Sequence, residues 1–148
     1  MAGTAQHATV SRTDTRTVTL AAPPHDVFDF VANPENLPRW AIGFCHSIRR
    51  DDRSGDRWVV TTGNGDITVR YVTDRALGVV DFHLSPAPGV ETVAYSRVVP
   101  NGDGAEYIFT QLQAPEMADD VFEGQVDALR EELVVLQALV RARVACGA

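Results

Sequence analysis

The chain has 148 residues, of which 45% are hydrophobic and 22% charged, and its formal net charge is −7. This length and composition fit one globular domain, and no apolar run approaches the roughly 20 residues that a membrane helix needs. The negative charge disfavours nucleic acid as a partner, and the absence of Lys excludes catalysis through a lysine Schiff base.

The first residues, MAGTAQHATVSRTD, contain neither the basic start nor the apolar stretch of a secretory signal. We expect residues 1–14 to form a flexible tail ahead of one domain that spans residues 15–144. The two cysteines, Cys45 and Cys146, are far apart in the sequence, which fits reduced thiols better than a disulfide. Together these features indicate a cytoplasmic protein.

The next segment predicts a strand followed by two short helices. The alternating stretch TRTVTLA predicts the strand, and Pro24 fits the first turn of an amphipathic helix that ends at Asn33-Pro34. Another proline shortly afterwards leaves barely one helical turn before Trp40. We expect Trp40 to point inward and to line or close the mouth of a cavity.

The rest of the chain predicts six strands and a long helix. From residue 42 to residue 113 the hydrophobic period is two, and the turn sequences DDRSGD, GNGD, DRALG, PAPG and NGDG separate β-rich runs. After Pro115, apolar residues recur at four-three spacing from Phe122 to Val140, which predicts a helix that lies on the sheet. This order of elements is typical of an α+β protein.

Three segments carry a family resemblance: VANPENLPRW after the first helix, RVVPNGDGAEYIFT as the penultimate hairpin, and the acidic start of the last helix. Over about Thr15 to Leu139 the chain resembles the START-like, SRPBCC superfamily, particularly its polyketide cyclase/dehydrase-like branch. The resemblance implies a helix-grip fold, with a curved antiparallel sheet of about seven strands around the C-terminal helix. It also implies a deep apolar cavity that binds lipids, hormones or polyketide-like molecules in different members, some of them enzymes.

The NGDG turn sets the register of the last hairpin. As a four-residue loop it places Ser96 opposite Phe109 and Ala94 opposite Gln111, so that small side chains face large ones. The same alternation directs residues of the earlier strands inward. The candidate ligand-binding residues are Trp40, Phe44, Trp58, Phe82, Ser96, Phe109, Gln111, Phe122 and Leu129.

Three polar side chains that we expect to face inward, His46, Tyr71 and Tyr107, are the candidate catalytic residues, because they could orient a ligand or move a proton. His46 lies two residues past Phe44, so both should face the pocket that Trp40 covers. Each of the three could instead be a core residue that is hydrogen-bonded to the backbone.

The stretch VVDFHL places Asp81 and His83 on one strand face, where they suggest an acid–base pair. The other face carries apolar Phe82, so we expect Asp81 and His83 to point to solvent. Arg70 and Arg97 fall on the same outward face and would complete a cross-strand charge ladder, although a one-residue bulge would reverse this. Similar aromatase/cyclases hold polyketide carbonyls with a cavity Arg, so an outward Arg70 weakens the cyclase interpretation.

The leading hypothesis is a cofactor-independent cyclase, dehydratase or similar enzyme that acts on a hydrophobic, polyketide-like small molecule. The alternatives are a non-catalytic carrier or sensor of an apolar small molecule, and an interaction module with a filled cavity. Motifs for a metal site, a phosphate loop or a serine nucleophile are absent, so we expect no cofactor and no metal. We expect a monomer or homodimer, without nucleic acid and without a membrane span.

Overall fold

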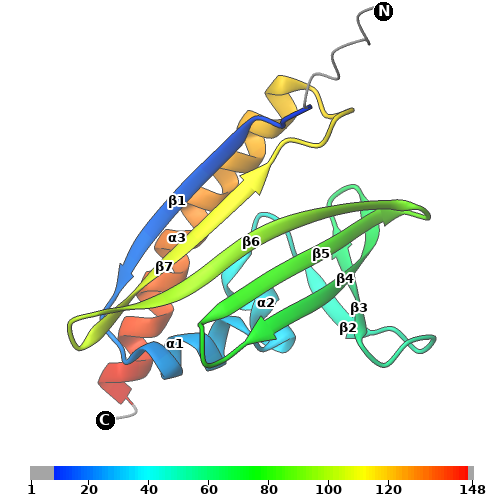
Figure 1. Ribbon diagram of the computed structural model, residues 1–148. Coiled ribbons are helices and arrows are strands. Elements are labelled where there is room, and N and C mark those ends of the chain that lie inside the picture. Colours follow the sequence, from blue (N-terminus) through cyan, green and yellow to red (C-terminus); the bar gives the residue numbers. More distant parts are fainter. Residues whose placement is uncertain (1–8, 147–148) are drawn as a thin grey trace, which may run out of the picture.

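The chain forms a seven-stranded antiparallel sheet and a long C-terminal helix, with short helices after the first strand (Figure 1). The computed structural model describes residues 9–146, and their side chains as far as residue 144. The elements are β1 (Thr13–Leu20), α1 (Pro24–Val31), η1 (Pro34–Asn36), α2 (Leu37–Trp40), β2 (Ser47–Arg50), β3 (Arg57–Thr62), β4 (Gly65–Asp74), β5 (Val79–Ala87), β6 (Val90–Asn101), β7 (Gly104–Leu112) and α3 (Asp119–Cys146).

The tail expected over residues 1–14 lies outside the described residues as far as residue 8, and β1 begins at Thr13, two residues earlier than expected. The strand order is β1-β7-β6-β5-β4-β3-β2, so the first strand pairs with the last one. In Figure 1, α3 lies along β1 and β7 and away from β4 and β5. This arrangement confirms the predicted α+β helix-grip fold.

The hairpin register follows from the turn sequences. In the NGDG turn Asn101 pairs with Gly104, which leaves a shorter connection than the four-residue loop that we expected. Gly102 supplies the positive φ, 58°, that this tight turn needs. Because both turn lengths give the same pairing, Ser96 still lies opposite Phe109, as predicted.

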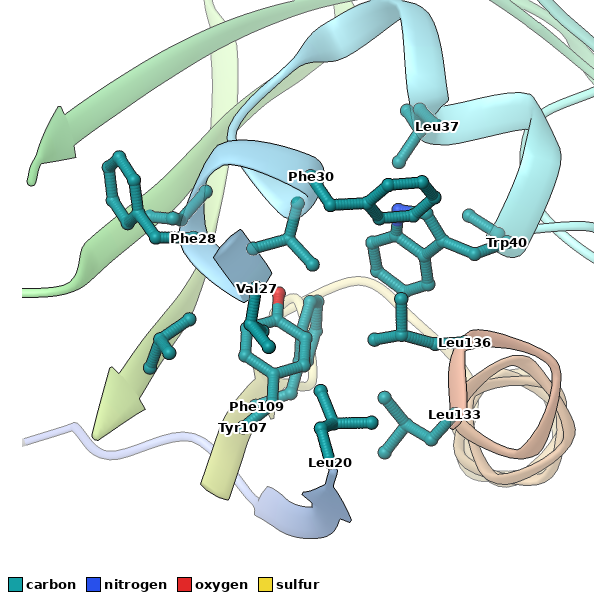
Figure 2. Packing of buried hydrophobic residues seen from close by; sticks show 14 of the residues in the cluster. Leu20, Val27, Phe28, Phe30, Leu37, Trp40, Tyr107, Phe109, Leu133 and Leu136 are labelled. Carbon is teal, nitrogen blue, oxygen red and sulfur yellow. The ribbon is translucent and has the colours of Figure 1, made fainter. Parts of the chain in front are cut away.

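The broken helical segment carries Trp40 into the core. The Asn33 side chain accepts a hydrogen bond from the Glu35 amide (3.1 Å) and caps η1, and Asn36 Nδ2 donates to Phe30 O (3.0 Å). Trp40 is 2% exposed and belongs to the same buried cluster as Leu136 of α3 (Figure 2). The inward orientation is confirmed, but the indole is enclosed in the core rather than placed at an open mouth.

The expected charge ladder on the outer face does not form. The face assignment is correct, because Val80 and Phe82 are buried, but Asp81 and His83 are half-buried rather than fully exposed. His83 Nδ1 lies 3.0 Å from Glu91 Oε1. Two of the other outward groups bind the backbone: Ser96 N donates to Asp81 Oδ1 (3.3 Å), and Arg97 Nε donates to Leu77 O (3.0 Å). Arg70 is half-buried and lies opposite His83. Local partners on adjacent strands thus replace the ladder.

Candidate functional site

One cross-strand row on the inner face of the sheet collects several of the predicted ligand residues. Tyr71 of β4 lies opposite Phe82 of β5, and Phe82 lies opposite Ala94 of β6. The register of β6 and β7 continues this row to Gln111. Ala94 is the small, buried residue between larger ones in this row. We call these four residues the inner row.

Aromatic rings connect the inner row to α2. The ring centroids of Tyr71 and Phe82 are 4.9 Å apart, and those of Phe82 and Phe109 are 5.7 Å apart. Tyr107 continues the series, at 6.2 Å from Phe109 and 6.2 Å from Trp40. The edge-to-face and tilted rings thus form one packed aromatic cluster, in which only Tyr71 is half-buried and the other rings are buried.

Two polar atoms of the inner row are buried without a hydrogen-bond partner among the described residues: Tyr71 Oη and Gln111 Nε2. A buried polar group without a partner costs about 1–3 kcal/mol, and Trp40 Nε1 in the core is a third such atom among the described residues. Burial raises the pKa of Tyr71 well above its usual 10, and the nearby Tyr107 and Cys45 raise it further. At neutral pH both atoms are therefore hydrogen-bond donors that lack an acceptor.

The hydroxyl of Tyr107, in contrast, has a hydrogen-bond partner within the protein. It donates to Ser96 Oγ at 2.9 Å, and Ser96 in turn donates to Val80 O. Burial raises the pKa of Tyr107, while the hydrogen bond to Ser96 lowers it. The structure thus gives Tyr107 and Ser96 a structural bond between β5, β6 and β7; Tyr107 is a core residue, as the alternative had it, but its partner is a side chain and not the backbone.

His46 and Trp58 lie in a surface groove of about 520 Å³. The groove is lined by Glu35, Pro38, His46, Ser47, Ile48, Arg50 and Trp58. His46 is exposed, so the expectation that it faces an enclosed pocket is wrong: its strand parity is inward, but it precedes β2 at the end of the sheet. The Arg50 guanidinium lies 4.8 Å from the centre of the Trp58 ring.

The groove adjoins the inner row. Trp58 is the register partner of Val69 on β4, and Tyr71 follows Val69 on the same strand face. Phe44, which precedes the groove in the chain, is half-buried against the core. The structure thus brings His46 and Trp58 into one groove, and Trp58 lies one register step from Tyr71 on the inner face.

Two other predicted ligand residues belong to the packing of α3. Phe122 is 0% exposed and lies beneath the Arg12 guanidinium, which is 5.2 Å from the ring centre. Leu129 is part of the main buried cluster. A second pocket, of about 420 Å³, lies between the start of α1 and the end of α3 and includes Phe30 and Val140. Neither pocket is the internal one that we expected between the sheet and α3.

Charged residues on the inner side were missed from the sequence. Glu132 is buried on the α3 face that also carries Leu129 and Leu136, and its helical spacing from both was a usable signal. Arg16 and Asp14 form an ion pair (3.0 Å) on the β1 face that carries Leu20. The inward parity of these two residues was visible in the strand sequence.

Two further findings concern metal binding and membrane-spanning helices. Among the side chains that the structure describes, residues 9–144, no three His, Cys, Asp or Glu gather in a way that could hold a metal ion. No helix in the described part of the chain is long and apolar enough to cross a membrane.

A family model described as polyketide cyclase / dehydrase and lipid transport matches residues 11–147. The chain belongs to this family. The family match confirms the resemblance to the START-like superfamily that the sequence motifs indicated. A comparison with curated proteins found no match.

Solved structures share the fold at low sequence identity. The Zhui aromatase/cyclase from Streptomyces sp. R1128 has a TM-score of 0.69 and 18% identity, over 90% of this chain and 95% of that chain. The di-domain ARO/CYC BexL from the BE-7585A biosynthetic pathway has a TM-score of 0.71 and 20% identity, over 90% of this chain and 47% of that chain. A START superfamily protein from Mycobacterium smegmatis has a TM-score of 0.64 and 14% identity, over 88% and 97%.

Proposed function

We propose that this member of the family is a cofactor-independent enzyme of the cyclase or dehydratase type, acting on a hydrophobic, polyketide-like small molecule. The substrate binds along the inner face, from Trp58 in the groove to Gln111 at the far end of the inner row. Family membership and the likeness to proteins described as aromatase/cyclases support this choice of substrate class.

The pair of unpartnered donors, Tyr71 Oη and Gln111 Nε2, carries the proposal. A molecule that bears carbonyl oxygens on an unsaturated carbon skeleton supplies the acceptors that these donors lack, and its flat rings pack against Phe82 and Phe109. In Figure 1, α3 does not cover the inner faces of β4 and β5, and Tyr71 is half-buried there with its hydroxyl oxygen enclosed.

The proposed chemistry is enolisation followed by loss of water. A base removes the proton from the carbon next to a carbonyl, and the electron pair moves onto the carbonyl oxygen, where the Tyr71 hydroxyl stabilises it by hydrogen bonding. The carbonyl re-forms as the neighbouring hydroxyl leaves with a proton as water. The raised pKa of Tyr71 keeps it protonated, so it is the donor in this scheme. We assign the proton transfers to the His46 imidazole in the adjoining groove.

The test uses prodan, an uncharged naphthyl ketone whose fluorescence responds to its surroundings and to hydrogen bonding at its carbonyl. Tyr71→Phe and Gln111→Leu should each weaken prodan binding about fivefold, the typical effect of losing one hydrogen bond. Tyr95→Phe is the matched control, because Tyr95 is 47% exposed and lies on the outer face of β6. Equal binding by all four proteins would contradict the site.

Turnover separates the enzyme from a carrier. A naphthyl β-hydroxyketone loses water to give a conjugated enone, which absorbs at longer wavelength, and the wild-type protein should accelerate this reaction. Binding of prodan at the inner row without any acceleration would favour the non-catalytic carrier or sensor.

A further inference from the structure

Glu132 is the one charged residue of the described chain that is buried, with 5% exposure. It lies on the core-facing side of α3, and no Arg or His among residues 9–146 lies within salt-bridge distance of it. Burying a carboxylate without a cation is costly, so its retention points to a role beyond packing.

The Glu132 carboxylate joins α3 to the connection between α2 and β2. Gly43 N donates to Glu132 Oε2 at 3.0 Å. A Cβ atom at Gly43 would lie 3.3 Å from that oxygen and 3.3 Å from Ala128 Cβ, so glycine permits the close approach of α3. The Phe44 amide, which donates to Ala41 O (3.0 Å), is also near enough to lower the pKa of Glu132.

The surroundings of Glu132 place its titration near neutral pH. Burial raises the pKa of Glu132 from its usual 4.5 to about 7, the Gly43 and Phe44 amides lower it, and Glu131 on the same helix raises it. In the α2–β2 connection, the Cys45 thiol donates to Ser47 O (3.4 Å) and is near enough to feel the charge of Glu132. Burial and then the Glu132 charge raise the pKa of Cys45 to about 11, so this thiol stays neutral.

The same connection borders the inner face. Cys45 is close enough to Tyr71 to raise the pKa of that hydroxyl, Phe44 packs half-buried against the core, and His46 lines the groove. Fixing the Gly43 backbone against α3 therefore fixes the segment that carries Phe44 and His46. An ionised carboxylate is a stronger acceptor for the Gly43 amide than a neutral carboxyl group.

We propose that Glu132 is a positioning residue for the inner-face site, and that its ionised form holds the Gly43–His46 segment in the arrangement that binds ligand. This inference rests on the proposed function, because it assigns regulation by pH to the same site. Protonation of Glu132 weakens the bond to Gly43 and loosens the segment, so ligand binding is stronger above neutral pH than below it.

The experiment follows two signals between pH 6 and pH 8: the NMR shift of the Gly43 amide, without ligand, and the dissociation constant of prodan. In the wild-type protein the Gly43 amide should titrate with a midpoint near 7, and prodan should bind about fivefold more tightly at pH 8. Glu132→Gln, which retains an acceptor oxygen but cannot ionise, should abolish both changes. Glu131→Gln, on the exposed side of α3, should retain both.

The outcomes are distinguishable. A Gly43 titration that Glu132→Gln removes, together with unchanged prodan binding between pH 6 and pH 8, would overturn the positioning role and leave the proposed function standing. A Gly43 amide that does not titrate would overturn the inference in the same way. If the wild-type protein binds no prodan at any pH, the proposed function fails, and with it the site that Glu132 is inferred to position.

Discussion

Tyr107 and Tyr71 make an instructive comparison, because both are tyrosines of the inner sheet face with enclosed hydroxyl oxygens, Tyr107 fully buried and Tyr71 half-buried. Near the β6–β7 hairpin, the Tyr107 hydroxyl donates to Ser96, whose own hydroxyl is bonded to Val80. On β4, the Tyr71 hydroxyl has no partner among the described residues, and neither has the Gln111 amide nitrogen in the same row. The end near the hairpin is thus closed by the Tyr107–Ser96–Val80 bonds, although Trp40 Nε1 beside it also lacks a partner, and the Tyr71 end is open to an external acceptor.

At the closed end, Trp40 is the residue whose removal should lower stability most. Trp40→Ala should lower the free energy of unfolding by about 3–5 kcal/mol, because a fully buried indole is replaced by a cavity. Urea denaturation measures this loss, and Trp58→Ala, at a half-buried position, is the control with a smaller effect. A loss below about 1 kcal/mol, combined with weaker prodan binding, would instead make Trp40 a lid over the ligand.

At the open end, His46 should matter for turnover and not for folding. His46→Ala should slow dehydration of the naphthyl β-hydroxyketone about 100-fold, the usual effect of losing a general acid or base, with little change in prodan binding. Its stability should change by less than about 0.5 kcal/mol, since the side chain is exposed. His25→Ala, at an exposed position of α1, is the control. Unchanged turnover would remove His46 from the mechanism.

Glu132 should make stability depend on pH. The folded protein holds this proton more tightly than the unfolded chain, because the pKa rises from 4.5 to about 7 on folding. Its contribution is therefore fully present below about pH 4.5 and is lost as the pH rises through 7, by roughly 3 kcal/mol. The stability of Glu132→Gln relative to wild type should increase by that amount between pH 4 and pH 8. A pH-independent difference would contradict the raised pKa.

The Ser96 bond tests whether the closed end is structural. Ser96→Ala leaves the Tyr107 hydroxyl buried without its acceptor and should destabilise the protein by about 1–3 kcal/mol in urea denaturation. Ser85→Ala, on the other face of the sheet, should change stability by less than about 0.5 kcal/mol. Equal effects of the two substitutions would show that the buried bond contributes nothing.

The fold was predictable because its signals are local. The proline that starts α1, the alternating strands and the NGDG turn each act within a few residues, and the register of the last hairpin follows from the turn alone. Even the error in turn length changed no pairing, because both versions of the loop give the same register.

The site was less predictable because it depends on contacts across the sheet. Strand parity placed Tyr71 and Tyr107 on the same inward face. Only the structure shows that the Tyr107 hydroxyl is bonded to Ser96 and that the Tyr71 hydroxyl has no partner among the described residues. Parity also directed His46 inward, although its place before β2, at the end of the sheet, leaves it exposed. Glu132 was detectable from its spacing on the apolar face of α3 and was overlooked.

The central claim is that the Tyr71 hydroxyl is left unpaired for a ligand, and unfolding of Tyr71→Phe with and without prodan tests it most directly. Without prodan, the variant should be as stable as wild type or up to about 1 kcal/mol more stable, because the substitution removes a buried polar atom that has no partner. With prodan, the variant should gain less stability than wild type, because it binds the ketone less tightly. A loss of 1 kcal/mol or more without prodan, with equal stabilisation by prodan, would contradict the claim and make Tyr71 a structural residue like Tyr107.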